Sequence, residues 1–396
     1  MIKFDFKTYQ KELNLDIYST YKQELINKLN TSRDMMGWYH FDDILKESLN
    51  KIKEEAKIVR EFSDVLVVIG IGGSSSGAKG IISALSPYFK KDNFEIIFAG
   101  ESFSSEYLIA LKEHLKDKRV TLNVISKSGE TLETSLTFEY LYEYLKTIYN
   151  ESELRNHIYI TTDEFDGSLR KFASEKNYKS FIIPKNVGGR FSMLTPVALF
   201  PIAVSGIDLD EFIRGASLEL LDTAVDYALI RNIMHQDRVV ESFTIYEPKL
   251  FYFTEWLKQL FAETECKNKK GLLPIITINS KDLHSVGQFY QEGTNILFET
   301  VISISNTKEI YINKYSKTLD DINNLAVSSV ASAHKQANNY SNIILVDKLT
   351  AFNMGSLVMF FEISSVMGAY LLDVAPFNQP GVDAYKHILM DKLNNK

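Results

Sequence analysis

The sequence predicts an α/β protein built from two doubly wound domains with mainly parallel sheets, preceded by an N-terminal helical segment. From about residue 64 onward, short runs rich in Val and Ile alternate with longer stretches at helical spacing, which is the pattern of a parallel sheet covered by helices. The chain has 396 residues, enough for two domains with cores of ordinary size. We therefore expect a helical segment over 1–60, a first domain over 61–205 and a second over 206–396.

The N-terminal segment shows helical spacing and no strand-like run. Apolar residues recur at intervals of three and four over 24–29 and again over 44–49. Nothing before Asp64 has the pattern of a buried strand, so only helices are expected here.

The first domain contains five strand candidates. The clearest is 65–69, Val-Leu-Val-Val-Ile, which leads into glycines and suits a parallel strand buried on both faces. The others are 95–98, 120–125, 157–160 and 181–183. Helical stretches separate them, for example 104–115 and 131–148. In a doubly wound sheet of this kind, ligands bind at the carboxyl ends of the strands.

The second domain repeats the alternation less regularly. Strands are expected over 239–246, 273–278, 296–304 and 343–346. Helices are expected over 210–228, 250–263 and 320–338, with a buried core helix over 357–375 and a tail helix from about Gly381.

Composition narrows the possible classes of function. The net charge is −7 and no dense basic patch is present, which disfavours a nucleic-acid binder. Cys266 is the only cysteine, so no internal disulfide can form, as in a reducing compartment. The N-terminus lacks the apolar region of a secretory signal, and the most apolar run contains Glu362 and Asp373, which disfavours a membrane span. We expect a cytoplasmic protein without nucleic-acid or membrane partners.

A first glycine cluster, 70–77 (Gly-Ile-Gly-Gly-Ser-Ser-Ser-Gly), follows the 65–69 strand and opens a helix. Free backbone N–H groups at such a position bind anions, and Gly73 and Ser74 are candidate phosphate ligands. The cluster is not a dinucleotide fingerprint, because Ser75 occupies the third glycine position, and it is not a P-loop, because Gly80 follows Lys79. The alternative is a tight turn without a ligand.

A second cluster, 126–131 (Ser-Lys-Ser-Gly-Glu-Thr), also lies between a strand and a helix. Ser126, Ser128 and Thr131 supply hydroxyl groups, and Lys127 supplies a positive charge if it faces inward. By itself the cluster could be an ordinary helix N-cap. Together the two loops could converge on one phosphate, so they predict a phosphorylated small molecule as the ligand.

Near the expected domain boundary, adjacent glycines precede an arginine in 186–196 (Asn-Val-Gly-Gly-Arg-Phe-Ser-Met-Leu-Thr-Pro). Glycines permit a close backbone approach, and the planar guanidinium of Arg190 suits oxygen anions. A phosphate that is already bound by hydroxyl and N–H groups does not require this positive charge. We therefore predict that Arg190 stabilises negative charge that develops during a reaction, such as that of an enediolate. The alternative is a domain linker with a surface arginine.

Candidate proton-transfer groups lie in the second domain. Glu263 is one helical turn beyond Gln259, so the two share a face, and a carboxylate at a cleft is a plausible general base. Glu265 lies nearer the lysine-rich stretch 267–270 and is expected to be solvated. His284 can exchange a proton near neutral pH. Lys386 lies one turn into the tail helix. On local sequence alone, Glu263 and Lys386 are more typical of surface side chains and His284 of a structural histidine.

The chain resembles the phosphoglucose isomerase family in its shorter bacterial form. The matching stretches follow the family's order: 69–77, 126–134, 187–196, 259–267, 283–293 and 377–386. Gly-Gly-Arg-Phe-Ser at 188–192 and the stretch 377–386 are specific to this family, whereas the serine-rich loops are shared among sugar isomerase domains. The resemblance implies two sugar-isomerase-type domains.

The resemblance also implies an activity and roles for individual residues. The reaction would be the reversible isomerisation of D-glucose 6-phosphate and D-fructose 6-phosphate through a cis-enediol, in glycolysis and gluconeogenesis, without metal or organic cofactor. Catalytic roles fall on Glu263 (base), Arg190 (intermediate), His284 and Lys386 (ring opening). Substrate-binding roles fall on Gly73, Ser74, Ser126, Lys127, Ser128, Thr131, Gln259 and Gln379. The family's active site forms between the subunits of a homodimer, with the histidine supplied by the neighbouring chain.

Three other functions compete with this one. A non-catalytic sugar-phosphate sensor would need the phosphate loops but not Glu263, His284 and Lys386 together. A related isomerase could also accept mannose 6-phosphate, a difference that lies in the pocket lining. A nicotinamide dehydrogenase is disfavoured by the broken glycine pattern. Metal catalysis is not expected, because no paired metal-ligand spacing occurs.

Overall fold

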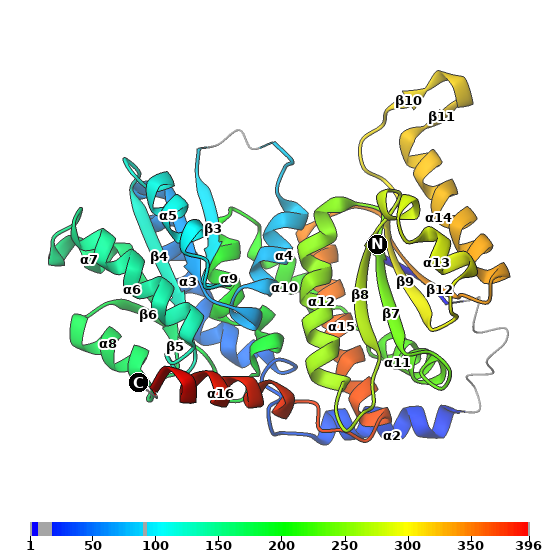
Figure 1. Cartoon of the computed structure of the whole chain (residues 1–396), viewed down its shortest axis with the longest axis horizontal. Helices are drawn as coiled ribbons and strands as arrows, with labels where there is room; N and C mark the ends of the chain where they lie inside the picture. The colour runs from blue at the N-terminus through cyan, green and yellow to red at the C-terminus, as the bar shows by residue number, and fades with distance from the viewer. Residues whose placement is uncertain (1, 7–17, 90–92, 395–396) are drawn as a thin grey trace. The chain divides into compact units, whose positions relative to one another are not determined.

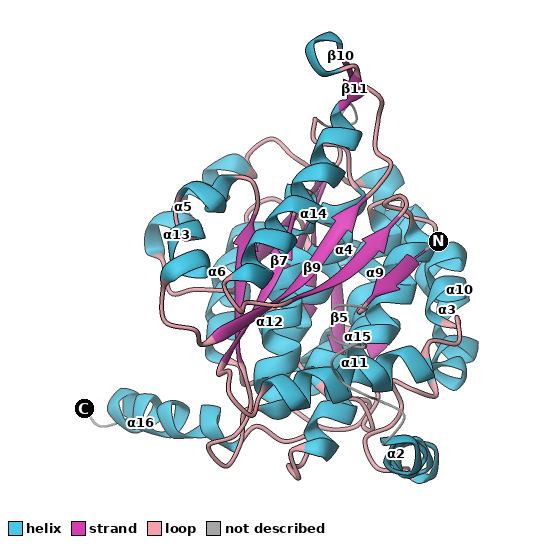
Figure 2. Ribbon diagram, turned by 90° about the vertical axis from the view of Figure 1, so that its right-hand side faces the viewer, coloured by secondary structure: helices cyan, strands magenta, loops and turns pink. Residues whose placement is uncertain are grey.

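Two five-stranded sheets, each flanked by helices, form the structure (Figures 1 and 2). The computed structural model describes residues 2–6, 18–89 and 93–394. The chain divides into two compact units, unit 1 (Met1–Ser32 and Arg214–Lys396) and unit 2 (Arg33–Ile213). The α/β class and the mainly parallel sheets predicted from the sequence are confirmed.

Unit 2 contains a wholly parallel sheet in the spatial order β3-β2-β4-β5-β6. Its strands are β2 (Val65–Ile69), β3 (Glu95–Ala99), β4 (Val120–Ile125), β5 (Ile158–Thr162) and β6 (Lys179–Ile182). Its helices are α3 (Phe41–Phe62), α4 (Ser76–Leu85), α5 (Ser105–His114), α6 (Leu132–Lys146), α7 (Glu151–His157), α8 (Ser168–Lys176) and α9 (Pro196–Val204). Every residue of β2 and β4 is buried. The sequence of β2 is wholly apolar and mostly β-branched, as a parallel strand covered on both faces requires, whereas β4 also buries the polar residues Thr121 and Asn123.

Unit 1 contains a second sheet in the order β1-β12-β9-β7-β8. Its parallel strands are β7 (Val240–Ile245), β8 (Leu273–Ile278), β9 (Leu297–Ile304) and β12 (Ser341–Val346). Its helices are α2 (Ser19–Thr31), α11 (Leu221–Met234), α12 (Phe251–Glu265), α13 (Gly287–Glu292), α14 (Leu319–Gln336), α15 (Ala351–Leu371) and α16 (Asp383–Asn394). A short hairpin, β10 (Tyr311–Ile312) with β11 (Lys317–Thr318), precedes α14.

The expectation of an entirely helical N-terminal segment was wrong. Ile2–Asp5 forms the edge strand β1, which pairs antiparallel with β12. The residues alternate between half-buried and exposed, as an edge strand with one covered face requires. The segment is also divided between the units, because α2 belongs to unit 1 and α3 to unit 2.

The helix expected over 210–228 is two helices. The first, α10 (Leu209–Ala216), ends before the second, α11, begins at Leu221. Gly215 lies so close to the backbone of α15 that an added Cβ would be 1.9 Å from the carbonyl oxygen of Phe352. This close approach accounts for a glycine at the end of α10.

The apolar run predicted as a core helix forms α15, which packs against α11 and α12. By length and composition α15 could cross a membrane, but 89% of its most apolar window is buried inside the fold. Thr350 caps its N-terminus by accepting a hydrogen bond from the backbone N–H of Asn353. Glu362 lies in the middle of this helix, is fully buried, and neither of its carboxyl oxygens has a hydrogen-bond partner within the described residues. Burial raises the pKa of Glu362 well above its ordinary value.

Glu362→Met should raise the free energy of unfolding by about 1–3 kcal/mol near pH 8, because it removes a buried carboxyl group that lacks hydrogen bonds. The folded protein keeps this proton to higher pH than the unfolded chain does, so wild-type stability falls as the pH rises above the ordinary value of 4.5. The gain should therefore be larger near pH 8 than near pH 5 in urea unfolding experiments. Glu309→Gln, an exposed carboxyl in unit 1, is the control. An equal gain at both pH values would contradict the interpretation.

Candidate active site

The two serine-rich loops flank the point where the strand order of unit 2 reverses. The strand β2 lies between β3 and β4, so the chain turns outward in opposite directions from β2 and β4. Crevices at such points, outside the carboxyl ends of the strands, bind ligands in open α/β sheets. The loop after β2 carries Gly73 and Ser74, and the loop after β4 spans 126–131. Topology therefore brings both predicted phosphate loops to one edge of the sheet.

The first loop touches the segment that carries Arg190. A Cβ added to Gly73 would lie 2.2 Å from the carbonyl oxygen of Gly189 and 2.6 Å from the backbone nitrogen of Arg190. Only glycine fits at this contact, so the Gly73 position serves close packing of the two backbones. Ser74 lies in the short helical turn Gly72–Ser74, and its hydroxyl makes no hydrogen bond within the described part of the chain.

The serine hydroxyl groups of the second loop accept backbone hydrogen bonds and can still donate a hydrogen bond to an anion. Ser126 Oγ accepts a hydrogen bond from the backbone N–H of Gly129 (3.0 Å) and lies 3.5 Å from Thr131 Oγ1. Ser128 Oγ accepts from the backbone N–H of Glu130 (3.1 Å). A serine hydroxyl that accepts a backbone hydrogen bond still has its own hydrogen to donate, which is what an anion requires. Gly129 adopts a φ of +79°, which permits this turn.

Lys127 connects the second loop to the arginine segment. Its Nζ donates to the carbonyl oxygens of Lys185 (3.1 Å) and Val187 (3.5 Å). Burial lowers the pKa of Lys127. The ammonium group, a predicted phosphate ligand, therefore binds the backbone that leads to Arg190.

Glu101, which was not among the predicted site residues, contacts the end of the first loop and the start of α4. Its two carboxylate oxygens accept hydrogen bonds from Ser75 Oγ (3.0 Å) and Lys79 Nζ (2.8 Å). Glu101 follows β3 by two residues, so its place at the carboxyl end of a strand was the signal that could have identified it.

Arg190 is almost completely buried, with 2% of its surface exposed. It lies in a short helical segment, Gly189–Leu194, and its guanidinium carbon is 5.4 Å from the centroid of the Phe191 ring. Phe191 packs in turn against Trp38, with ring centroids 5.2 Å apart. Thr195 then caps α9. These core contacts hold the arginine on a rigid segment rather than on a flexible linker.

In unit 1, Glu263 and Gln259 share one face of α12. Gln259 Nε2 donates to Glu263 Oε1 at 3.1 Å, as their four-residue spacing predicts. The Glu263 side chain is half-buried. The expectation that Glu265 is solvated was wrong: only 2% of it is exposed, because it faces inward and pairs with Arg231, 34 residues earlier in the chain.

Glu263 and His284 lie at opposite edges of the unit 1 sheet. The helix α12 connects the parallel strands β7 and β8, so it runs antiparallel to them and its C-terminal end lies at their amino ends. His284 follows the carboxyl end of β8, which spans about 20 Å. Within unit 1, therefore, the structure does not bring the histidine to the glutamate. His284 is exposed and makes no hydrogen bond within the described residues.

The segment that carries Gln379 and Lys386 begins at the edge where Glu263 lies. The helix α15 follows the parallel strand β12 and returns to the amino ends of the strands. Lys267, just beyond α12, donates through Nζ to the carbonyl oxygen of Ala375. Both Gln379 and Lys386 are exposed. Among residues 2–6, 18–89 and 93–394, no group of three His, Cys, Asp or Glu side chains could hold a metal ion.

Comparison with known proteins identifies a family. The family model described as phosphoglucose isomerase matches residues 42–260. A glucose-6-phosphate isomerase of Fusobacterium nucleatum subsp. nucleatum is 39% identical, with 98% of this chain and 93% of the relative covered. One of Caldanaerobacter subterraneus subsp. tengcongensis is 40% identical, with 92% of this chain and 87% of the relative covered.

Solved structures share the fold. The crystal structure of a hypothetical protein from Thermus thermophilus matches with a TM-score of 0.91 and 25% identity, covering 100% of both chains. A glucose-6-phosphate isomerase from Chlamydia trachomatis matches with a TM-score of 0.76 and 21% identity, covering 88% of this chain and 73% of that one, which shows the fold alone.

Proposed function

The chain belongs to the phosphoglucose isomerase family, and we propose that it catalyses the reversible isomerisation of D-glucose 6-phosphate and D-fructose 6-phosphate through a cis-enediol intermediate. The observation that carries this proposal is the identity of 39% to a glucose-6-phosphate isomerase over 98% of the chain. The enzyme is an intramolecular aldose–ketose isomerase that acts in glycolysis and gluconeogenesis.

The chemistry requires a base that moves a proton between C1 and C2 of the open-chain sugar. We assign this role to Glu263, whose carboxylate is held by Gln259 and is accessible from solvent. The enediol carries developing negative charge on oxygen, which the guanidinium of Arg190 stabilises. His284 and Lys386 act earlier, on the ring oxygen and the anomeric hydroxyl, because the cyclic sugar must open before C2 becomes acidic.

The phosphate group binds at the serine-rich edge of unit 2. The hydroxyls of Ser74, Ser126, Ser128 and Thr131 donate to its oxygens, and the topological switch point between β2 and β4 supports this assignment. Lys127 contributes long-range positive charge and holds the backbone that precedes Arg190. Gln259 and Gln379 position the sugar hydroxyls.

The direct test mixes the purified chain with fructose 6-phosphate and follows glucose 6-phosphate in a coupled assay. Turnover well above that of Glu263→Gln is expected, and turnover no higher than that of the variant would refute the activity. Binding of fructose 6-phosphate without turnover would indicate a sugar-phosphate sensor instead. The same assay with mannose 6-phosphate tests whether the pocket accepts the C2 epimer.

The active site forms between the subunits of a homodimer. Glu263 and His284 lie at opposite edges of one sheet, which supports this proposal. Unit 1 of a single chain cannot bring both side chains into contact with the same sugar molecule. A further support is α16, where Tyr385, Ile388 and Leu393 lie near Lys386 and are each more than half exposed (53%, 57% and 54%). Exposed apolar side chains of this kind are typical of a surface that binds another protein chain.

The proposal also includes two sugar-isomerase-type domains, one centred on each sheet, and a location in the cytoplasm.

Mixing two inactive variants should restore activity if the histidine acts on the neighbouring chain. In a heterodimer of Glu263→Gln and His284→Ala chains, one site combines an intact Glu263 with the partner's intact histidine and the other combines both lesions. Random re-pairing after reversible dissociation should therefore recover about one quarter of wild-type activity. Mixing two preparations of the same variant is the control. No recovery, with heterodimers present by mass spectrometry, would place both residues in one chain's site.

A further inference from the structure

Charged residues alternate at the C-terminal end of the helix that carries the proposed base. Glu263, Glu265 and Lys267 lie at every second position. Side chains two residues apart on a helix point about 200° away from each other. Glu263 accordingly lies on the accessible face of α12 and Glu265 on the buried face.

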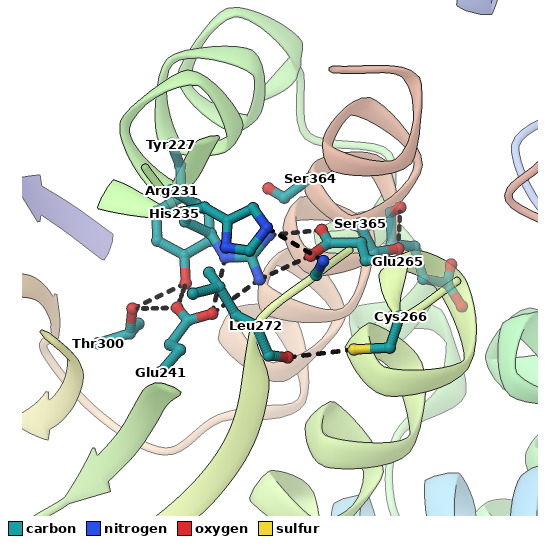
Figure 3. A network of polar contacts seen from close by, with 12 residues as sticks. Tyr227, Arg231, His235, Glu241, Glu265, Cys266, Leu272, Thr300, Ser364 and Ser365 are labelled. Carbon is teal, nitrogen blue, oxygen red and sulfur yellow. Dashed lines mark hydrogen bonds and ion pairs between the residues drawn. The ribbon is translucent and has the colours of Figure 1, made fainter. Parts of the chain in front are cut away.

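On the buried face, Glu265 is fixed by Arg231 (Figure 3). The two guanidinium NH groups donate to Oε1 and Oε2 of Glu265 at 2.5 and 3.0 Å. Arg231 Nε also donates to Glu241 on β7 at 2.8 Å. Tyr227 and Thr300 donate to the other oxygen of Glu241, each at 2.7 Å. The pair is thus part of a hydrogen-bonded chain that connects α11, α12 and the sheet.

Close packing removes the remaining freedom of this carboxylate. The guanidinium carbon of Arg231 lies 4.1 Å from the centroid of Phe261, one turn before Glu265 on α12. A Cβ added to Gly368 on α15 would lie 2.0 Å from Glu265 Oε1. The end of α12 is therefore closely packed against α11 on one side and against α15 on the other, which restricts its rotation.

On the solvent-exposed side of α12, the side chain of Lys267 binds backbone carbonyl groups at the end of the helix. Its Nζ donates to the carbonyl oxygen of Thr264 at 2.8 Å and to that of Ala375 at 2.5 Å. Thr264 is the residue next to Glu263, and Ala375 precedes the segment that carries Gln379 and Lys386. One ammonium group thus joins the backbone of the proposed base to the start of the second catalytic segment.

We propose that Arg231 and Lys267 are positioning residues for the isomerase reaction: Arg231, through Glu265, fixes the rotation of α12, and Lys267 fixes its end relative to the Gln379–Lys386 segment, so that together they direct the Glu263 carboxylate. This inference rests on the proposed function of Glu263. A buried ion pair is a poor source of net stability compared with apolar packing. The structural consequence of the buried arginine and its two carboxylates is therefore fixed geometry more than added stability.

Lys267→Met is the decisive variant, because Lys267 is only half-buried, whereas Arg231 and Glu265 lie in the core. We expect kcat to fall about 10-fold to 100-fold with KM for fructose 6-phosphate changed less than about threefold, since a displacement of about 1 Å is costly to catalysis. Lys270→Met is the matched control, because Lys270 Nζ donates to Leu372 at the end of α15 and makes no hydrogen bond to α12. Lys267→Arg should restore most of the lost kcat.

Arg231→Lys and Glu265→Gln test the buried side, with thermal unfolding measured in parallel. They should lower kcat like Lys267→Met while KM stays near that of the wild type. If they fail to fold, the Lys267 series alone decides. A kcat of Lys267→Met equal to that of the wild type or of Lys270→Met would overturn the proposal. A wild-type chain without isomerase activity would instead refute the proposed function, so the two failures are distinguishable.

Discussion

Glu263→Gln should lower kcat by about three orders of magnitude or more, while KM for fructose 6-phosphate changes by less than about threefold. Glutamine has the same shape and keeps an oxygen that can accept the hydrogen bond from Gln259, but it cannot take a proton from carbon. The loss should therefore fall on the proton transfer and not on substrate binding. Coupled kinetics at varied and saturating fructose 6-phosphate measure kcat and KM, and deuterium incorporation from D2O at C2 of the glucose 6-phosphate formed reports the proton transfer.

Glu255→Gln on the same helix is the matched control. Within the described residues Glu255 pairs with Lys258, at 2.6–2.8 Å, and with no other charged group, so its neutralisation should leave kcat unchanged within about twofold. Substantial deuterium incorporation by Glu263→Gln would assign the base to another residue.

Arg190→Ala should lower kcat by about 10²–10³-fold and raise KM much less. The guanidinium is the proposed partner of the charge that develops on the enediol, and removing one preorganised donor of this kind typically has an effect of that size. The phosphate is held by separate hydroxyls, so ground-state binding should largely survive. Arg190→Lys should recover only part of the loss, because lysine keeps the charge but not the planar pair of donors.

Since Arg190 is 2% exposed, thermal unfolding of each variant must accompany the kinetics. A raised KM with unchanged kcat in a folded variant would return Arg190 to the phosphate site. A loss of kcat that follows only the fraction of folded protein would make the residue structural.

Local sequence determined the strands and their loops. The run at β2 is apolar throughout and the run at β4 is apolar except for Thr121 and Asn123, and both are buried over their full length because both faces of each strand are covered. The serine-rich loops after these strands were therefore predictable as a pair at the carboxyl edge. The edge strand β1 was missed although Ile2, Lys3, Phe4 and Asp5 alternate, because four residues gain strand structure only from a partner about 340 residues away.

The partners of charged side chains could not be predicted from local sequence. Neighbouring lysines suggested that Glu265 is solvated, yet Arg231 and the missing side chain of Gly368 create a buried place for its carboxylate. Lys127 is predicted near a phosphate, and in the structure its Nζ also donates to the Lys185 and Val187 carbonyls, partners that its local sequence does not indicate. A long charged side chain pairs with groups that are close to it in the folded structure, and local sequence does not show which groups these are.

The sequence by itself thus determined the α/β class, the alternation of strands and helices, and the chemical groups available for the reaction, since these follow from periodicity and residue type. Only the tertiary structure decided which of these groups share an edge of a sheet. It joined Gly73 to the Arg190 segment, linked the end of α12 to the Gln379–Lys386 segment through Lys267, and separated His284 from Glu263 by the length of β8. The reason is that strand order and helix direction, set by pairing between distant segments, fix where each loop emerges.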